Sequence, residues 1–163
     1  MNHQKDISEL HTERIILRGI DESDAEEIVR WRGDPEVYRY FKAPHQITLT
    51  EHLDWYHYQY LTSPDRMDWI GLLAENGRKI GVFGLVFDGD AAEVSYLLAP
   101  EAQHFGYAVE AVRELIRFAF STGIRQVTAE IHRENSASLN LARRLGFRQM
   151  DHKGDFLIYG IEE

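Results

Sequence analysis

Residues 92–132 read AEVSYLLAPEAQHFGYAVEAVRELIRFAFSTGIRQVTAEIH, and this stretch decides the fold. The short apolar runs at 92–98 and 126–132 are typical of strands, whereas 105–121 carries apolar residues at helical spacing. A strand, a helix and a strand in this order form a right-handed crossover, so the two strands are parallel if they share a sheet. Ligands tend to bind where such strands end and the next helix begins.

The flanking segments predict strands that pair in antiparallel fashion. Asn76-Gly77 separates two apolar runs and signals a hairpin, because this turn needs positive φ. Thr50 is a good N-cap for a helix, and Gly146 a good C-terminal stop. We therefore predict an α/β fold with a mixed, mostly antiparallel twisted sheet around one parallel pair. Its strands lie at about 14–18, 67–74, 79–87, 92–98, 126–132, 147–151 and 156–161, and its helices at about 23–31, 50–61, 105–121 and 135–145.

Composition limits the class of protein. The 163 residues suit one domain, which we assign to 1–163 with its core at about 12–161, and 44% apolar residues suffice for a packed core. A net charge of −9 argues against nucleic acid as the main partner. Cysteine is absent, which excludes disulfides and a thiol nucleophile. The first ten residues lack an apolar signal core and no run approaches a membrane span, so we expect a cytoplasmic protein without a membrane partner.

The turn before the long helix is a candidate phosphate site. A tight turn that leads into a helix exposes unpaired backbone N–H groups, and the helix dipole adds positive charge there. Together they can hold a pyrophosphate, and Gly106 lets the backbone approach it closely. A glycine at a helix start is also ordinary capping, so the turn alone does not identify a ligand.

Two longer motifs give this turn a context. The stretch AEVSYLLAPEAQHFGYAVEAV, followed by ENSASLNLARRLGF, closely resembles the GNAT superfamily of N-acetyltransferases. The opening TERIILRGIDESDAEEIVRWRGDPEV resembles the branch with ribosomal-protein N-terminal, polyamine and amino-sugar acetyltransferases. The resemblance runs from about Thr12 to Ile161. It implies the GNAT fold, with a central splayed parallel pair and helices on both sheet faces, and acetyl-CoA as co-substrate without a metal.

The resemblance also implies which residues bind the cofactor. The family's pyrophosphate loop corresponds to Gln103, Gly106 and Ala108. The preceding strand would bind pantetheine through backbone groups. Asn135 matches the family asparagine on the pantetheine arm, although it is equally a candidate helix N-cap. The implied cofactor-binding residues are Tyr96, Leu98, Gln103, His104, Phe105, Gly106, Tyr107, Ala108, Asn135 and Ser138.

The chain departs from the family pattern in two places. His104 and Phe105 are bulkier than is usual there, and we expect the turn to accommodate them if neither adopts positive φ. Ala142 stands where many members carry a tyrosine that protonates the leaving thiolate. The general acid therefore stays unassigned.

A base must take the ammonium proton before the amine attacks the thioester. Glu93 and His132 are the candidate catalytic residues, because each lies on a strand beside the expected cleft. Strand alternation puts Glu93 on the opposite face from Tyr96, so a solvated glutamate is an alternative. His132 could be purely structural, and Glu130 is an outside candidate. The eight histidines show no metal-ligand spacing.

We expect the acceptor to lie between the helix at 50–61, the loop before it at 40–48 and the final hairpin. The expected acceptors are a small-molecule amine, such as an amino-sugar or its nucleotide conjugate, a protein or peptide N-terminus, and a polyamine. A non-catalytic CoA-binding sensor or scaffold, favoured by Ala142, is the main alternative, and a plain interaction domain is a third. A homodimer also stays open.

Overall fold

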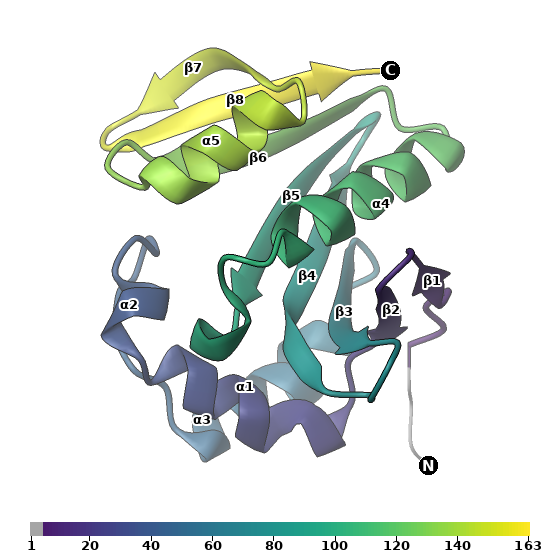
Figure 1. Cartoon of the computed structure of the whole chain (residues 1–163), viewed down its shortest axis with the longest axis vertical. Coiled ribbons are helices and arrows are strands. Elements are labelled where there is room, and N and C mark those ends of the chain that lie inside the picture. The colour runs from purple at the N-terminus through teal and green to yellow at the C-terminus, as the bar shows by residue number, and fades with distance from the viewer. Residues whose placement is uncertain (1–4) are drawn as a thin grey trace.

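The computed structural model describes residues 5–163. Its centre is an eight-stranded sheet with the order β1-β2-β3-β4-β5-β6-β8-β7 (Figure 1). Within the described residues, β5 and β6 form the parallel pair and the other neighbours are antiparallel, which confirms the predicted sheet. The strands are β1 Leu10–His11, β2 Ile15–Gly19, β3 Arg66–Leu73, β4 Lys79–Asp88, β5 Ala91–Leu98, β6 Gln126–His132, β7 Arg148–Lys153 and β8 Phe156–Glu162.

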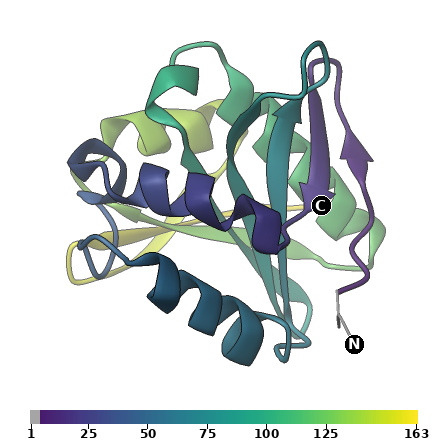
Figure 2. The same cartoon turned by 90° about the horizontal axis from the view of Figure 1, so that it is seen from below.

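Helices cover both faces of the sheet, as predicted (Figures 1 and 2). We call the face under α4 and α5 the α4 face, and the opposite face, under α1 and α3, the α1 face. The α-helices are α1 Ala25–Arg32, α2 Pro35–Tyr38, α3 Leu49–Trp55, α4 Tyr107–Ser121 and α5 Ser136–Arg144. Shorter turns are the 3₁₀-helices Glu22–Asp24 and Pro100–Ala102 and the π-helix Tyr56–Tyr60, which continues α3.

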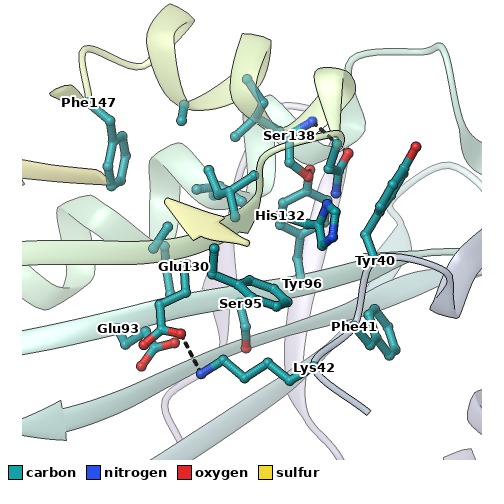
Figure 3. A pocket seen from close by; sticks show the side chains of 18 residues that line it. Tyr40, Phe41, Lys42, Glu93, Ser95, Tyr96, Glu130, His132, Ser138 and Phe147 are labelled. Atoms are coloured by element: carbon teal, nitrogen blue, oxygen red, sulfur yellow. Dashed lines mark hydrogen bonds and ion pairs between the residues drawn. The ribbon is translucent and has the colours of Figure 1, made fainter. Parts of the chain in front are cut away.

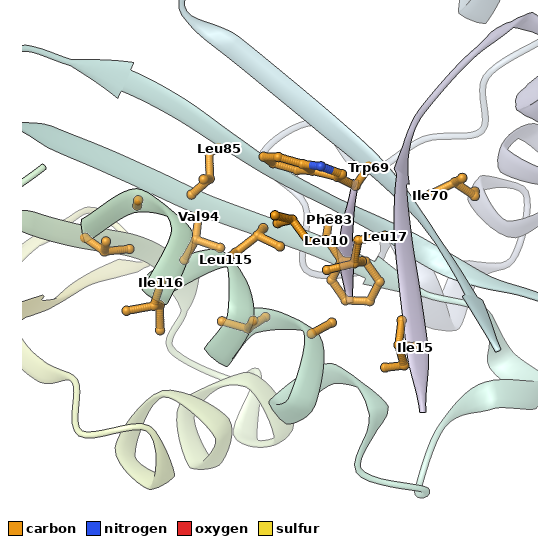
Figure 4. Close-up of a cluster of buried hydrophobic side chains, with 14 of the residues drawn as sticks. Leu10, Ile15, Leu17, Trp69, Ile70, Phe83, Leu85, Val94, Leu115 and Ile116 are labelled. Carbon is orange, nitrogen blue, oxygen red and sulfur yellow. The ribbon is translucent and has the colours of Figure 1, made fainter. Parts of the chain in front are cut away.

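The main core lies between α4 and the sheet (Figure 4). Leu115 from α4 and Phe83 from β4 are fully buried there. Trp69 from β3 packs edge-on against Phe118 of α4, with ring centroids 5.5 Å apart, and donates its indole N–H to the Ser8 carbonyl at 2.8 Å. Because β3, β4 and β5 are locked to α4 in this way, the carboxyl end of β5 has a fixed position.

Three local features differ from the sequence prediction. Helix α3 is capped by Thr48, not Thr50, because the Thr48 side chain and Glu51 form a reciprocal capping box. Helix α4 begins at Tyr107, two residues later than predicted, because Gly106 caps it with φ of +80°. The 33–35 break that was read as a stop also starts α2, whose first residue is Pro35.

Candidate active site

The parallel pair separates soon after it forms. β5 and β6 are in register at three positions, and the last joins Glu93 to Thr128. Beyond this point a cavity of about 330 Å³ lies between the strands, which we call the splay cavity. The splayed arrangement expected from the family resemblance is therefore present.

The splay cavity connects the two faces of the sheet. Side chains alternate along each strand, so Glu93 and Ser95 lie on the α1 face and Tyr96 on the α4 face. All three line the cavity. Figure 3 shows Glu93 near Glu130 on one side of the opening and Tyr96 near Ser138 on the other. Groups held on opposite faces can thus meet through the sheet.

A groove on the α4 face leads into the splay cavity. It has a volume of about 530 Å³ and runs between the start of α4 and α5. Of the ten residues predicted to bind the cofactor, seven line it, and they come from three separate elements of the chain. These are Tyr96, Leu98, Gln103, His104, Ala108, Asn135 and Ser138.

The remaining three cofactor candidates lie outside this lining. Phe105 and Tyr107 stack on each other, with centroids 5.5 Å apart. Arg14 holds them there: it donates a 3.0 Å hydrogen bond to the Phe105 carbonyl and lies over the Tyr107 ring. Arg14 is itself fixed by a 2.7 Å ion pair with Glu110. Nothing in the sequence pointed to Arg14, because it is 91 residues from Phe105.

The turn departs from the expected backbone at His104. We expected the turn to accommodate His104 and Phe105 if neither adopts positive φ, but His104 has φ of +72°. That expectation is wrong. Histidine tolerates this region better than most residues, although it costs of order 1–2 kcal/mol. Gly106 adds a second positive φ two residues later, and together they bend the chain into α4.

The α5 side of the groove carries hydrogen-bonding groups. The Asn135 side-chain oxygen accepts from the Ser138 N–H at 3.2 Å, so Asn135 is the N-cap of α5 and also lines the groove. The hydroxyls of Tyr96 and Ser138 are 2.8 Å apart. Burial raises the pKa of Tyr96, so its phenol stays protonated and can donate. Ala142 also lines the splay cavity.

Carboxylates gather on the α1 face of the splay cavity. Burial raises the pKa of Glu93, and the neighbouring Glu130 carboxylate raises it further. Lys42 from the α2–α3 loop lies 2.5 Å from Glu130 (Figure 3). Sequence reasoning missed Lys42, because a loop lysine gives no signal of what it contacts. Together, the Glu93 and Glu130 carboxylates form a site that can hold an ammonium group and accept its proton.

His132 lies at the same opening but is engaged otherwise. Its Nδ1 accepts a hydrogen bond from the Glu134 N–H at 3.1 Å. This bond assigns the proton of the neutral ring to Nε2, so neither nitrogen keeps a free lone pair. The ring packs between Tyr40 and Phe156, with centroids 5.3 Å away in both cases. The geometry favours a structural role for His132 and leaves Glu93 as the better base candidate.

Of the segments expected to hold the acceptor, the loop and the final hairpin line the splay cavity, whereas the helix lines a separate cavity on the α1 face. Tyr40, Phe41 and Lys42 from the α2–α3 loop border the splay cavity, and Phe156 of the final hairpin joins them.

Among residues 5–163 no helix is long and apolar enough to cross a bilayer. Over the same residues, no group of three metal-ligating side chains comes together.

Comparison with known proteins identifies the family. The model of the acetyltransferase (GNAT) domain matches residues 14–148. The uncharacterized protein MJ1062 of Methanocaldococcus jannaschii is 29% identical over 145 residues, which cover 83% of this chain and 28% of that longer protein.

Solved structures show the same fold. A domain from Methanocaldococcus jannaschii superposes with a TM-score of 0.83 at 26% identity, over 92% of this chain and 99% of that one. The spermidine N-acetyltransferase of Vibrio cholerae, solved with CoA and spermine, gives 0.81 at 18% identity over 93% and 96%. The chain therefore belongs to the GNAT acetyltransferases.

Proposed function

We propose that the protein transfers an acetyl group from acetyl-CoA directly to a primary amine of a small molecule, with the amine bound on the α1 face. The observation that carries this proposal is the splay cavity, which joins the cofactor groove to the carboxylates around Glu93. Cofactor and acceptor approach from opposite faces, so both can be bound at once. This arrangement suits a ternary complex better than a covalent enzyme intermediate.

The cofactor would lie in the groove with its pyrophosphate at the start of α4. Its pantetheine arm would follow β5 toward Asn135. Beyond Glu93, β5 has no strand partner on its β6 side within the described chain. The backbone groups near Tyr96 and Leu98 on that edge are thus available to the pantetheine amides and to the oxyanion of the tetrahedral intermediate.

Glu93 would act as the general base on the acceptor. An ammonium group would replace Lys42 beside Glu130, and its proton would pass to Glu93 directly or through one water. The neutral nitrogen then attacks the thioester carbonyl. The C–N bond forms, the C–S bond breaks, and CoA leaves as a thiolate. The nitrogen loses its second proton as the amide forms, and the thiolate takes up a proton to leave as the free thiol. The raised pKa of Glu93 brings this carboxylate closer to the proton affinity that a base needs at neutral pH.

The Tyr96 hydroxyl is our candidate donor to the leaving thiolate, in place of the tyrosine absent at Ala142. Tyr96→Phe should lower kcat about tenfold and leave the KM for acetyl-CoA nearly unchanged, since one hydrogen bond is lost only as the thiolate forms. Steady-state kinetics with thiol detection would measure this. Tyr107→Phe is the matched control, because that ring lies outside the groove. Equal kcat in wild type and Tyr96→Phe would remove Tyr96 from the mechanism.

The acceptors that we propose are an amino-sugar or its nucleotide conjugate, a protein N-terminus, and a polyamine. A panel of these amines, assayed by release of free CoA thiol, tests the function. Turnover of any of them supports it. The alternative is a CoA-binding sensor or scaffold in the cytoplasm, which Ala142 favours. Tight CoA binding without turnover on the whole panel would favour this alternative.

A further inference from the structure

A second cavity lies on the α1 face, between the sheet and helices α1 and α3. Its volume is about 360 Å³. We call it the arginine cavity, since two of its walls are Arg32 of α1 and Arg66 of β3. The other ionisable groups that line it are His45, Glu51, His52 and Asp68.

The charged groups of the arginine cavity are not all joined in ion pairs. Asp68 is buried and accepts a 3.0 Å hydrogen bond from Nε of Arg66, so these two charges neutralise each other. Glu51 is occupied in the capping box, where it accepts from the Thr48 N–H at 3.2 Å. Arg32 has no carboxylate partner among residues 5–163, and its buried Nε has no hydrogen-bond partner there either. The cavity therefore holds one guanidinium that makes no ion pair with the described residues.

The surroundings of Arg32 keep this charge available. The guanidinium lies over the Phe41 ring, 5.2 Å from its centroid, which orients it without neutralising it. Burial, and then the nearby Arg32 charge, lowers the pKa of His52, so His52 stays neutral at pH 7 and can donate or accept a hydrogen bond. A half-buried cation without an ion-pair partner is partly desolvated, and an anion bound from solvent would offset that cost.

The arginine cavity is linked to the splay cavity across the sheet. Asp68 of β3, Gly84 of β4 and Ser95 of β5 form one cross-strand row on the α1 face. A Cβ on Gly84 would lie 2.1 Å from Oδ1 of Asp68 and 3.4 Å from Oγ of Ser95. The Asp68 carboxylate therefore lies over Gly84, close to Ser95, so the two cavities are neighbours on this face with that carboxylate between them. Phe41, which borders the splay cavity, forms a second link through its contact with Arg32.

We propose that the arginine cavity is an acceptor subsite that binds an anionic group, a phosphate or a carboxylate, through Arg32. This rests on the proposed function, in which the amine lies beside Glu93. From β3 to β5 is two strand spacings, so the anion would lie roughly 10 Å from the amine. A guanidinium fork suits either anion. A polyamine would instead bring a second cation to Arg32, so this subsite ranks polyamines last among the proposed acceptors.

Binding of inorganic pyrophosphate and of acetate to the CoA-saturated protein tests the subsite without catalysis. Titration calorimetry should show at least one anion binding to wild type. Arg32→Met should weaken that binding about 10- to 100-fold, the size of one lost hydrogen bond between charged groups. Arg113→Met, an exposed arginine on α4, is the matched control. Arg32→Gln serves if the methionine variant does not fold. No binding to wild type, or equal binding to wild type and the Arg32 variants, overturns the proposal.

Turnover of paired amines distinguishes a phosphate from a carboxylate as the anion that Arg32 binds. Glucosamine 6-phosphate is compared with glucosamine, and triglycine, which spans about 10 Å when extended, with its amide. Arg32→Met should lower kcat/KM about 10- to 100-fold for one anionic member of a pair and leave its neutral partner unchanged. If glucosamine is acetylated but no pair depends on Arg32, the subsite is wrong and the acetyltransferase proposal stands. If pyrophosphate or acetate binding depends on Arg32 but no amine is acetylated, the subsite stands and the proposed function falls.

Discussion

Glu93→Gln is expected to lower kcat about 10²–10⁴-fold while CoA affinity stays near that of wild type, because a general base contributes that much and the amide cannot accept the proton. The glutamine keeps the size of the side chain. Its position on the α1 face keeps it away from the cofactor groove. Steady-state kinetics on the best amine, together with CoA titration by calorimetry, would measure both quantities.

His132→Gln is the comparison variant. Because its Nδ1 is engaged by the Glu134 N–H, this change should cost much less in kcat than the loss of Glu93. A larger loss of kcat in His132→Gln than in Glu93→Gln would make His132 the base. Its ring would then have to release that bond in the complex. Nearly full activity in both variants would exclude both, and Glu130 or a chain of waters would then be tested next.

The pKa of Glu93 gives this prediction a second readout. Since burial and Glu130 raise that pKa, kcat/KM of wild type should fall as the pH drops through it, in addition to any effect of amine protonation. The same raised pKa has the opposite consequence for stability, because ionised Glu93 helps catalysis but destabilises the folded protein. Above its folded pKa the ionised carboxylate is disfavoured in the native state, so Glu93→Gln should raise Tm at pH 7. This gain should disappear below the carboxyl's unfolded pKa near 4, as thermal unfolding at both pH values would show. An unchanged Tm at pH 7 would mean that Glu93 is not desolvated.

Gly106→Trp is expected to abolish the thermal stabilisation that CoA confers. Gly106 caps α4 with φ of +80°, and a large side chain there would strain the turn and occupy the space in front of the helix N-terminus. A ligand at 100 times its Kd stabilises a protein by about 2.7 kcal/mol, so the loss of its shift is easily seen by scanning fluorimetry.

Gly123→Trp separates strain from ligand loss. Gly123 also has positive φ, +96°, and nothing lies within 4 Å of its added Cβ. It follows the other end of α4, roughly 25 Å away along the helix. Both variants should lose similar intrinsic stability, but only Gly106→Trp should lose the CoA shift. A retained shift in Gly106→Trp would place the pyrophosphate elsewhere.

The sequence by itself determined the topology around the site. Short apolar runs and a helical pattern within residues 92–132 predicted the crossover, and local backbone chemistry marked the turns. Gly77 and Gly146 adopt the positive φ that a hairpin turn and a helix stop require. The motifs on either side of the long helix also indicated most of the groove that we assign to the cofactor. These features depend on residues close together in the chain, so the sequence carries them directly.

Only the tertiary structure decided how the side chains are used. His104 takes positive φ because the chain must turn into α4, and Arg14 anchors that turn from a distant strand. The choice between Glu93 and His132 rests on a hydrogen bond and a burial that no pattern shows. The unpaired charge of Arg32 exists only because β3, α1 and the α2–α3 loop meet. Charge balance and burial arise from contacts between segments far apart in sequence, and strand register and packing set those contacts.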